Sequence, residues 1–462
     1  MRVLKPSAGP RAIRQQVPDR TAGDPPADGP PADGSPADGP PADGSPGGQR
    51  AGEADDRPDA PAGPPSPRRG SPALLVGALS GVVAAALTGY LVATVLQRKF
   101  SGDFPSHLKF TVAGIDTLRY PGNALFYLLN ALFAGFSTDR GRLVQSLLAV
   151  LMIAAAAKVW ISVAWVAAEH RRSVPADRSV PAGRGMAAGR LPFWAAGAAG
   201  LCAFTFSLPA AYPYLGQLPP NVWHNSTTML LMPFAIGLFW ASLAYLRTGG
   251  RRLLWIMLLL AALNVAAKPS FVFCFLVVFP LAALLTRRNR GEVLRAWLVT
   301  AATAVFVAAQ YVYIYGTRPG GPNPTNASGV ALDPLRVWSV YSDNIPVSLL
   351  CSYFFPLVAL LAGGAAIRRH PAVRYAVALA GVGLLFFVLF KESGYRELHG
   401  NFIWQAVVTN YLLFLALVGA AVPWLRRSRF RWRQAAVVLA FALHVAAGVH
   451  YLHHYLTAGT FA

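Results

Sequence analysis

Residues 403–433 read IWQAVVTNYLLFLALVGAAVPWLRRSRFRWR, an uncharged apolar run that ends in a cluster of arginines. An α-helix needs about 20 apolar residues to cross a hydrocarbon core about 30 Å thick. Similar apolar runs recur from Ser71 to Tyr455. Only 13% of the residues are charged, against roughly 25% in soluble domains. We therefore predict an all-α, polytopic helical membrane protein.

Eleven apolar segments of the chain qualify as membrane spans, and the fifth and sixth meet at Lys268-Pro269. The segment 121–136 is apolar but short, so we expect a re-entrant or interfacial helix there rather than a twelfth span. The predicted spans are roughly 73–97, 141–168, 191–211, 226–247, 253–267, 269–286, 296–315, 345–367, 374–390, 403–424 and 434–455.

Arginine placement predicts the orientation of these spans. Every second gap is rich in arginine, and the positive-inside rule puts such gaps in the cytoplasm. The N-terminus is then expected inside and the C-terminus outside, in the plasma (inner) membrane. The net charge of +21 follows from these loops, so we predict no nucleic-acid partner. The arginine-rich gaps contain Arg171, Arg251, Arg288, Arg369 and Arg427.

Residues 1–70 differ from the rest of the chain. The unit Pro-Ala-Asp-Gly occurs four times between Pro26 and Gly44, and apolar residues are too sparse to form a core. Such a composition predicts a disordered segment, here a cytoplasmic tail. The remaining 71–462 form the predicted membrane domain.

The arginine-poor gaps hold the polar residues that can do chemistry. In the first of them, helical spacing would put Asp103 and His107 on one face. A carboxylate beside an imidazole can take a proton from a hydroxyl group or bind a divalent metal. The alternative is that Asp103 is a solvated acid near the end of a helix.

The next arginine-poor gap, residues 212–228, is aromatic, rich in proline and uncharged. Tyr214 and Trp223 fit either an interfacial aromatic belt or a wall for stacking sugars, with His224 as a hydrogen-bond donor. Asn225 or Ser226 is expected to cap the following helix. Lys268 lies in an apolar stretch, where a lysine must reach the interface or bind an anion such as phosphate.

The densest group of ionisable residues lies in residues 391–405, KESGYRELHGNFIWQ, between two spans. We expect Lys391 and Arg396 to hold a phosphate through charge-assisted hydrogen bonds. The remaining polar residues are expected to bind sugar hydroxyls. They are Glu392, Glu397, His399 and Asn401.

With its many spans and an acid early in the first outer loop, the chain resembles the GT-C-type polytopic glycosyltransferases. The resemblance implies a polyprenyl-phosphate-linked sugar as donor and a glycan, lipid or protein as acceptor, within the membrane lipids. Asp103 would then be the catalytic base or a metal ligand, and the need for a divalent metal is left open. His107, His224 and Lys268 would join the loop residues above in binding substrate.

The chemistry of such a transfer supports this interpretation separately. A lipid-linked donor requires a carboxylate to deprotonate the acceptor and cations to stabilise the departing phosphate. A transporter or flippase for lipid-linked glycans is the main alternative, and an envelope polysaccharide polymerase or ligase is another. Transporters usually place ionisable groups at the middle of the membrane, whereas here the groups cluster near the ends of the spans.

Overall fold

A computed structural model describes residues 72–460 apart from 174–191, 288, 317–328 and 428–430. The predicted tail, 1–70, lies outside the described residues. The described chain is mainly helical with one small two-stranded sheet, which confirms the all-α prediction. Eight of its helices are long and apolar enough to cross a membrane, so the fold is that of a multi-pass membrane protein. These are α1 (Pro72–Arg98), α4 (Arg140–Ser173), α7 (Ser226–Thr248), α10 (Arg290–Gly316), α12 (Ile345–Ala362), α14 (Pro371–Leu389), α15 (Ile403–Arg427) and α16 (Trp432–Ala458).

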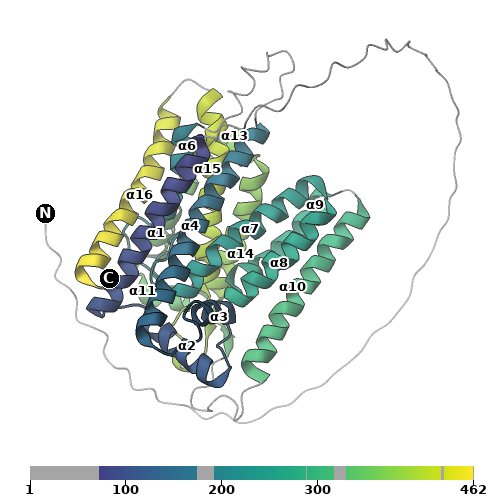
Figure 1. Ribbon diagram of the computed structural model, residues 1–462. Coiled ribbons are helices and arrows are strands. Elements are labelled where there is room, and N and C mark those ends of the chain that lie inside the picture. The colour runs from purple at the N-terminus through teal and green to yellow at the C-terminus, as the bar shows by residue number, and fades with distance from the viewer. Residues whose placement is uncertain (1–71, 174–191, 288, 317–328, 428–430, 461–462) are drawn as a thin grey trace, which may run out of the picture. The chain divides into compact units, whose positions relative to one another are not determined.

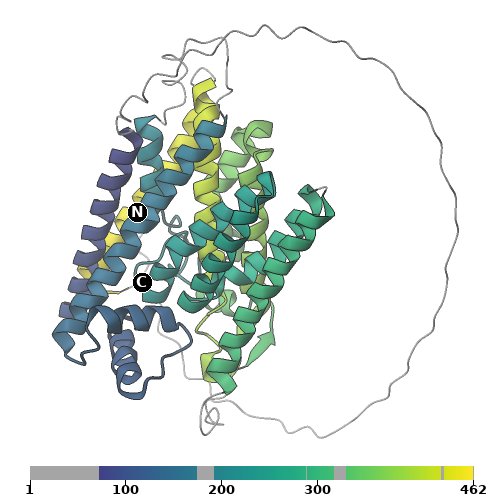
Figure 2. The same cartoon turned by 45° about the vertical axis from the view of Figure 1, so that its right-hand side comes forward.

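Three further predicted spans correspond to shorter helices. The fifth and sixth are α8 (Arg251–Ala267) and α9 (Ser270–Thr286), which meet at Lys268-Pro269 as expected. A proline disfavours helical backbone in the residue before it, and Lys268 is extended. In Figures 1 and 2, α8, α9 and α10 form one flank of the helical bundle.

The predicted third span, 191–211, is not one continuous helix. Helix α6 (Phe193–Leu201) passes into a 3-10 turn, η1 (Cys202–Phe204), and the chain then runs without helix as far as Asn225. Pro209 disfavours helical backbone near the end of the predicted span, and Pro213, Pro219 and Pro220 disfavour it in the segment that follows. Non-helical backbone at membrane depth must find partners inside the protein. Asn221 supplies two of them by donating to the carbonyls of Cys202 and Thr205, at 2.8 and 2.7 Å.

Short elements cover the end of the bundle that is poor in arginine. Helices α2 (Phe104–Thr117), α3 (Ala124–Phe133) and α11 (Arg336–Tyr341) lie toward the lower end of Figure 1. Helix α3 is too short to span, in agreement with the expectation for 121–136. The predicted span 345–367 is divided into α12 and α13 (Gly364–Arg368). Strands β1 (Val330–Leu332) and β2 (Phe390–Glu392) pair antiparallel, and the turn η3 (Gly394–Arg396) follows.

Helix α15 is the centre of the bundle, with 94% of its apolar window buried inside the protein. Its neighbour α14 approaches closely at Gly383, where an added Cβ would lie 2.9 Å from the carbonyl oxygen of Gln405. Helix α1 packs on α4 in the same way, with Gly81 facing Ala156. Small residues allow this approach in membranes, where helices associate through close packing.

Side-chain contacts join the arginine-bearing helix ends to one another. Arg247 near the end of α7 contacts Glu169 near the end of α4, and Arg426 of α15 contacts His170. Asp103, Asn225 and Lys268 are joined at the opposite ends of these helices. The alternation expected from the arginines is therefore present in the fold, while the inner membrane and the orientation in it stay predictions.

Candidate functional site

Asp103 occupies the turn between α1 and α2, where its backbone is held from two sides. Its N–H donates to the carbonyl of His224 at 3.2 Å, and its own carbonyl accepts from His107 N–H at 3.0 Å. The side chain does not cap α2. It accepts a hydrogen bond of 2.6 Å from the amide nitrogen of Asn225 instead. The carboxylate therefore faces the start of α7 rather than its own helix.

Asn225 connects the carboxylate to the rest of the site. Its side-chain oxygen caps α7 by accepting from the Thr228 N–H at 3.0 Å, as the sequence predicted. The same oxygen accepts from the Lys268 ammonium at 3.0 Å. Because this oxygen is committed to donors, the amide nitrogen is the atom that must face Asp103. The assignment of the two amide atoms thus follows from the hydrogen-bond network.

Lys268 completes the group from the junction of α8 and α9. Its ammonium donates to the Thr228 hydroxyl at 2.8 Å and lies 4.2 Å from the centre of the Trp404 ring. A cation over the face of a tryptophan is favourable, more so where water is excluded. Three hydrogen-bonded side chains, Asp103, Asn225 and Lys268, therefore link α2, α7 and the α8–α9 junction beside the first turn of α15.

Burial and the neighbouring charges have opposing effects on the pKa values of Asp103 and Lys268. Burial raises the pKa of Asp103, while the Asn225 hydrogen bond and the Lys268 charge oppose that rise. Burial lowers the pKa of Lys268 to about 7, against the opposing effect of Asp103. Burial also lowers the pKa of His224 to about 3 and of His107 to about 4, with Lys268 adding to both shifts. Both imidazoles are therefore neutral at pH 7, and the remaining ionisable groups of the site are the Asp103 carboxyl and the Lys268 amine, which is only partly protonated at that pH.

The two histidines differ in their surroundings. The imidazole of His107 bonds the Tyr127 hydroxyl at 2.8 Å, so it joins α2 to α3 instead of contacting the Asp103 carboxylate. The ring of His224 lies edge-on to Tyr214, with centroids 4.4 Å apart, and 5.9 Å from Trp404. His224 thus packs among the aromatic residues of the site, whereas His107 holds α2 against α3.

Tyr214 and Trp223 are 4% and 8% exposed, so they are packed inside the protein. The interfacial-belt interpretation of these two residues is therefore wrong, because belt residues face lipid headgroups. Trp223 stacks near Phe206 and Tyr451, with ring centroids 5.7 Å apart in each pair. The role of this aromatic cluster in stacking sugars stays a prediction.

The loop between α14 and α15 is held by ion pairs within itself and with the segment around β1 and α11. Lys391 lies 2.7 Å from Asp333 and 2.9 Å from Glu397, which Arg336 also contacts at 2.9 Å. These hydrogen bonds and charges lower the pKa of Glu397 and raise that of Lys391. This part of the loop is thus engaged by the short helix α11 and the strand β1 rather than directed to Asp103.

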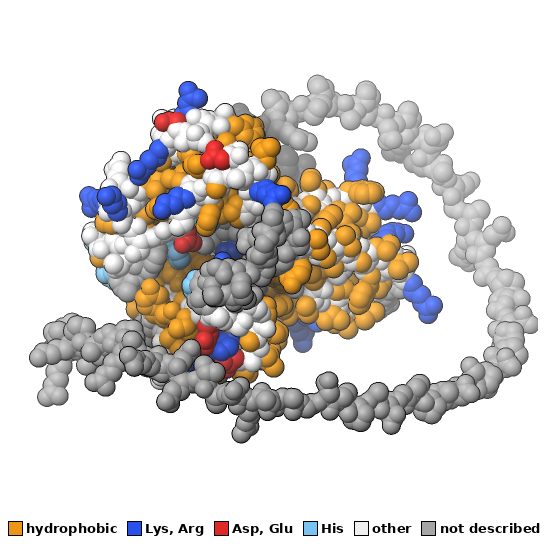
Figure 3. Space-filling view, turned by 90° about the horizontal axis from the view of Figure 1, so that it is seen from below, with side chains coloured by type: hydrophobic (Ala, Val, Ile, Leu, Met, Phe, Trp, Pro, Cys, Tyr) orange, Lys and Arg blue, Asp and Glu red, His pale blue; other side chains and the backbone are white. Residues whose placement is uncertain are grey.

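The remaining predicted loop residues lie close by. Asn401 donates to the carboxylate of Glu392 at 2.5 Å. Arg396 ends η3, and its carbonyl accepts from the His399 N–H at 2.9 Å. The loop meets the Asp103 group through Trp404, at the start of α15. Figure 3, seen from below, shows acidic, basic and histidine side chains near the middle of this face, among hydrophobic ones. Substrate binding by these four loop residues stays a prediction.

A divalent metal does not fit the side chains around Asp103. Its carboxylate receives an amide donor, and the nearest charge that affects it is the Lys268 ammonium. A metal would require further oxygen or nitrogen ligands in place of these donors. Across the part of the chain that the structure describes, no three His, Cys, Asp or Glu side chains gather as a metal site.

The sequence pointed to Asp103, His224 and Lys268 but did not show which side chains connect Asp103 to Lys268. Asn225 was expected only as a helix cap, and Thr228 and Trp404 were given no role of their own. The run Asn-Ser-Thr-Thr at 225–228 was the available signal, since it exceeds what one cap requires. A comparison with protein-family models and with curated proteins gives no match to this chain.

Proposed function

We propose that this protein is a membrane glycosyltransferase that moves a sugar from a polyprenyl-phosphate donor to an acceptor hydroxyl at the arginine-poor end of the bundle. The observation that carries the proposal is the Asp103–Asn225–Lys268 group, a carboxylate joined through one amide to an ammonium. It unites residues that are far apart in the sequence and lies next to buried aromatic rings.

Each half of the group matches one requirement of sugar transfer. As the acceptor oxygen bonds to the anomeric carbon, the bond from that carbon to the donor phosphate oxygen breaks. Asp103 takes the acceptor proton, and the pKa-raising effect of burial makes it a better base than a solvated aspartate. The phosphate leaves with the bonding electron pair, and the Lys268 ammonium stabilises its charge.

The neighbouring residues support substrate positioning. Neutral His224 and the Trp404 ring offer a hydrogen-bonding edge and an aromatic face beside the carboxylate. The loop residues Arg396, His399 and Asn401 are the proposed contacts to phosphate and sugar. Glu392 positions Asn401, and Glu397 holds the loop through Lys391 and Arg336. The acceptor is a glycan, lipid or protein of the cell envelope, and a polymerase or ligase would use the same chemistry on a longer glycan.

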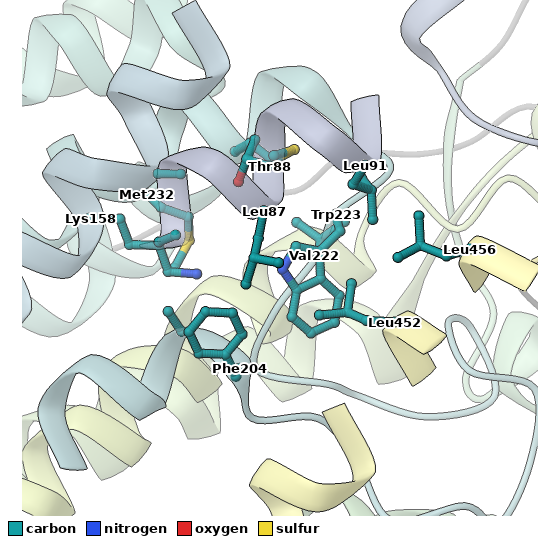
Figure 4. A pocket seen from close by; sticks show the side chains of 14 residues that line it. Leu87, Thr88, Leu91, Lys158, Phe204, Val222, Trp223, Met232, Leu452 and Leu456 are labelled. Atoms are coloured by element: carbon teal, nitrogen blue, oxygen red, sulfur yellow. The ribbon is translucent and has the colours of Figure 1, made fainter. Parts of the chain in front are cut away.

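A specific observation favours the second candidate, a transporter or flippase for lipid-linked glycans. Lys158 lies near the middle of α4, hydrogen-bonds Asn221 on the non-helical segment, and is 4.2 Å from the centre of the Tyr411 ring. Lys158 lines a largely apolar cavity of about 90 Å³. Figure 4 shows its side chain there together with those of Phe204 and Met232. Broken helices and cations at mid-membrane are typical of transporters.

Reconstitution of the purified protein in vesicles separates these candidates. A labelled polyprenyl-phosphate sugar is added with a candidate acceptor, and both labelled product and movement of the donor between leaflets are measured. The proposal predicts labelled product that forms without net movement and persists in the Lys158→Met variant. Movement without product, abolished by Lys158→Met, would instead establish the transporter.

A further inference from the structure

A second cluster of charged side chains lies at the arginine-rich end, where α4, α7, α14 and α15 meet. Arg247 donates to both carboxylate oxygens of Glu169, each at 2.7 Å. Arg172 reaches the same carboxylate at 3.3 Å, and the ring nitrogen Nε2 of His370 lies 3.4 Å from it. Two guanidiniums and an imidazole thus share one carboxylate, which leaves the cluster with excess positive charge.

These four side chains line a pocket of about 510 Å³, with Trp424 and Pro371 also in its wall. The side chains of Arg172 and Arg247 are 44% and 22% exposed, so each keeps N–H groups accessible to a ligand. His370 immediately precedes α14, and the N-terminal end of a helix favours anions. Arginines that only set membrane orientation need not converge in this way, whereas these converge from separate helices.

An apolar groove of about 580 Å³ adjoins this pocket and shares Arg247 and Pro371 with it. The groove runs between α7, α9 and α14. Leu281 and Leu285 in its wall are 49% and 84% exposed, and the exposed Arg374 lies beside them. The cationic pocket and the apolar groove therefore lie side by side at one end of the bundle.

We propose that this composite pocket binds an anionic phospholipid of the surrounding bilayer, separately from the proposed transferase site. The lipid phosphate lies against Arg172, Arg247 and His370, and an acyl chain follows the groove between α7, α9 and α14. Guanidinium groups bind phosphate oxygens through paired, charge-assisted hydrogen bonds. Basic pockets between membrane helices on the cytoplasmic side suit anionic headgroups. Glu169 is a positioning residue that holds Arg247 toward the pocket.

Lipid titration of the purified full-length protein, followed by native mass spectrometry, tests the headgroup half of the site. Phosphatidylglycerol should bind and phosphatidylcholine should bind far more weakly. The double variant Arg172→Gln/His370→Gln should weaken phosphatidylglycerol binding by about tenfold or more, since two of the three proposed phosphate contacts are lost. Arg252→Gln removes an exposed arginine of the same end outside the pocket, and binding should stay unchanged. Equal binding of both lipids, or an unaffected double variant, would overturn the proposal.

The groove half is tested with Ala282→Trp, which fills the space beside Leu281, against Ala301→Trp on the outward face of α10. Only the first should weaken phosphatidylglycerol binding, and inorganic phosphate should compete poorly because it cannot occupy the groove. Strong competition by inorganic phosphate together with no effect of Ala282→Trp would assign the pocket to a free anion and refute the lipid. Because Ala282 is only half-buried, this variant gives a result even if the double variant does not fold.

Discussion

Substituting Asn225 separates its two tasks, the capping of α7 and the contact to Asp103. Asn225→Asp keeps the oxygen that accepts from Thr228 N–H and Lys268 but replaces the donor that lies 2.6 Å from the Asp103 carboxylate. Two carboxylates this close do not both ionise near neutrality, so one keeps its proton. Because Asp103 then shares a proton with the introduced carboxyl group, it is less able to take the acceptor proton, and a loss of about 1.5–3 kcal/mol corresponds to roughly 10- to 150-fold in rate.

Asn225→Ala removes the cap as well, which costs about 1 kcal/mol of stability. We therefore expect Asn225→Asp to keep a near-wild-type Tm in detergent but to transfer sugar slowly at neutral pH. The rate should recover in part as the pH rises and the shared proton leaves, because the added negative charge also holds the proton on Lys268 to higher pH. Asn225→Ala should lose both stability and rate. Ser226→Ala is the matched control and should change neither. An Asn225→Asp protein with wild-type rate and an unchanged pH profile would refute the role of this amide.

Three further outcomes follow from other parts of the structure. Because burial lowers the pKa of Lys268 to about 7, the transfer rate should fall as the pH rises above that value and the ammonium loses its proton; Lys268→Arg, which stays charged, should remove this alkaline decline. A Cβ at Gly383 would lie 2.9 Å from an α15 carbonyl oxygen, so Gly383→Ala should lower the stability of the protein by about 1–3 kcal/mol in thermal unfolding. Gly381 faces open space, so Gly381→Ala is the control and should leave stability unchanged. Equal Tm values for the two variants would contradict this. In intact cells, an impermeant thiol reagent should label a cysteine placed at Ser106 and leave one at Arg252 unlabelled, and the reverse pattern would invert the predicted orientation.

Hydropathy was sufficient to predict the helical fold because long apolar runs have one solution in a bilayer, a helix with its backbone satisfied internally. It failed at 191–211, where prolines and buried side-chain partners such as Asn221 replace the helical hydrogen bonds. Hydropathy averaged over an apolar window does not distinguish a helix from a segment whose backbone is hydrogen-bonded by side chains.

The charged residues of the candidate site were predicted from the sequence, but the hydrogen bonds that join them were not. Asp103 and Lys268 stood out because isolated charges beside apolar spans require partners. The partner that joins them, Asn225, is uncharged and already had a local explanation as a helix cap. The many ionisable groups of the loop 391–401 suggested a ligand site. Two of them, Lys391 and Glu397, instead form ion pairs with each other and with neighbouring elements.

The most direct measurement of the central claim is sugar transfer by Asp103→Asn in reconstituted vesicles, with donor binding measured on the same preparation. Asparagine keeps the shape of the side chain but cannot accept the acceptor proton. We expect the transfer rate to fall roughly 100- to 10,000-fold, as loss of a general base implies, while the polyprenyl-phosphate donor binds about as well as before. Full transferase activity in the Asp103→Asn protein would show that Asp103 is not the catalytic base.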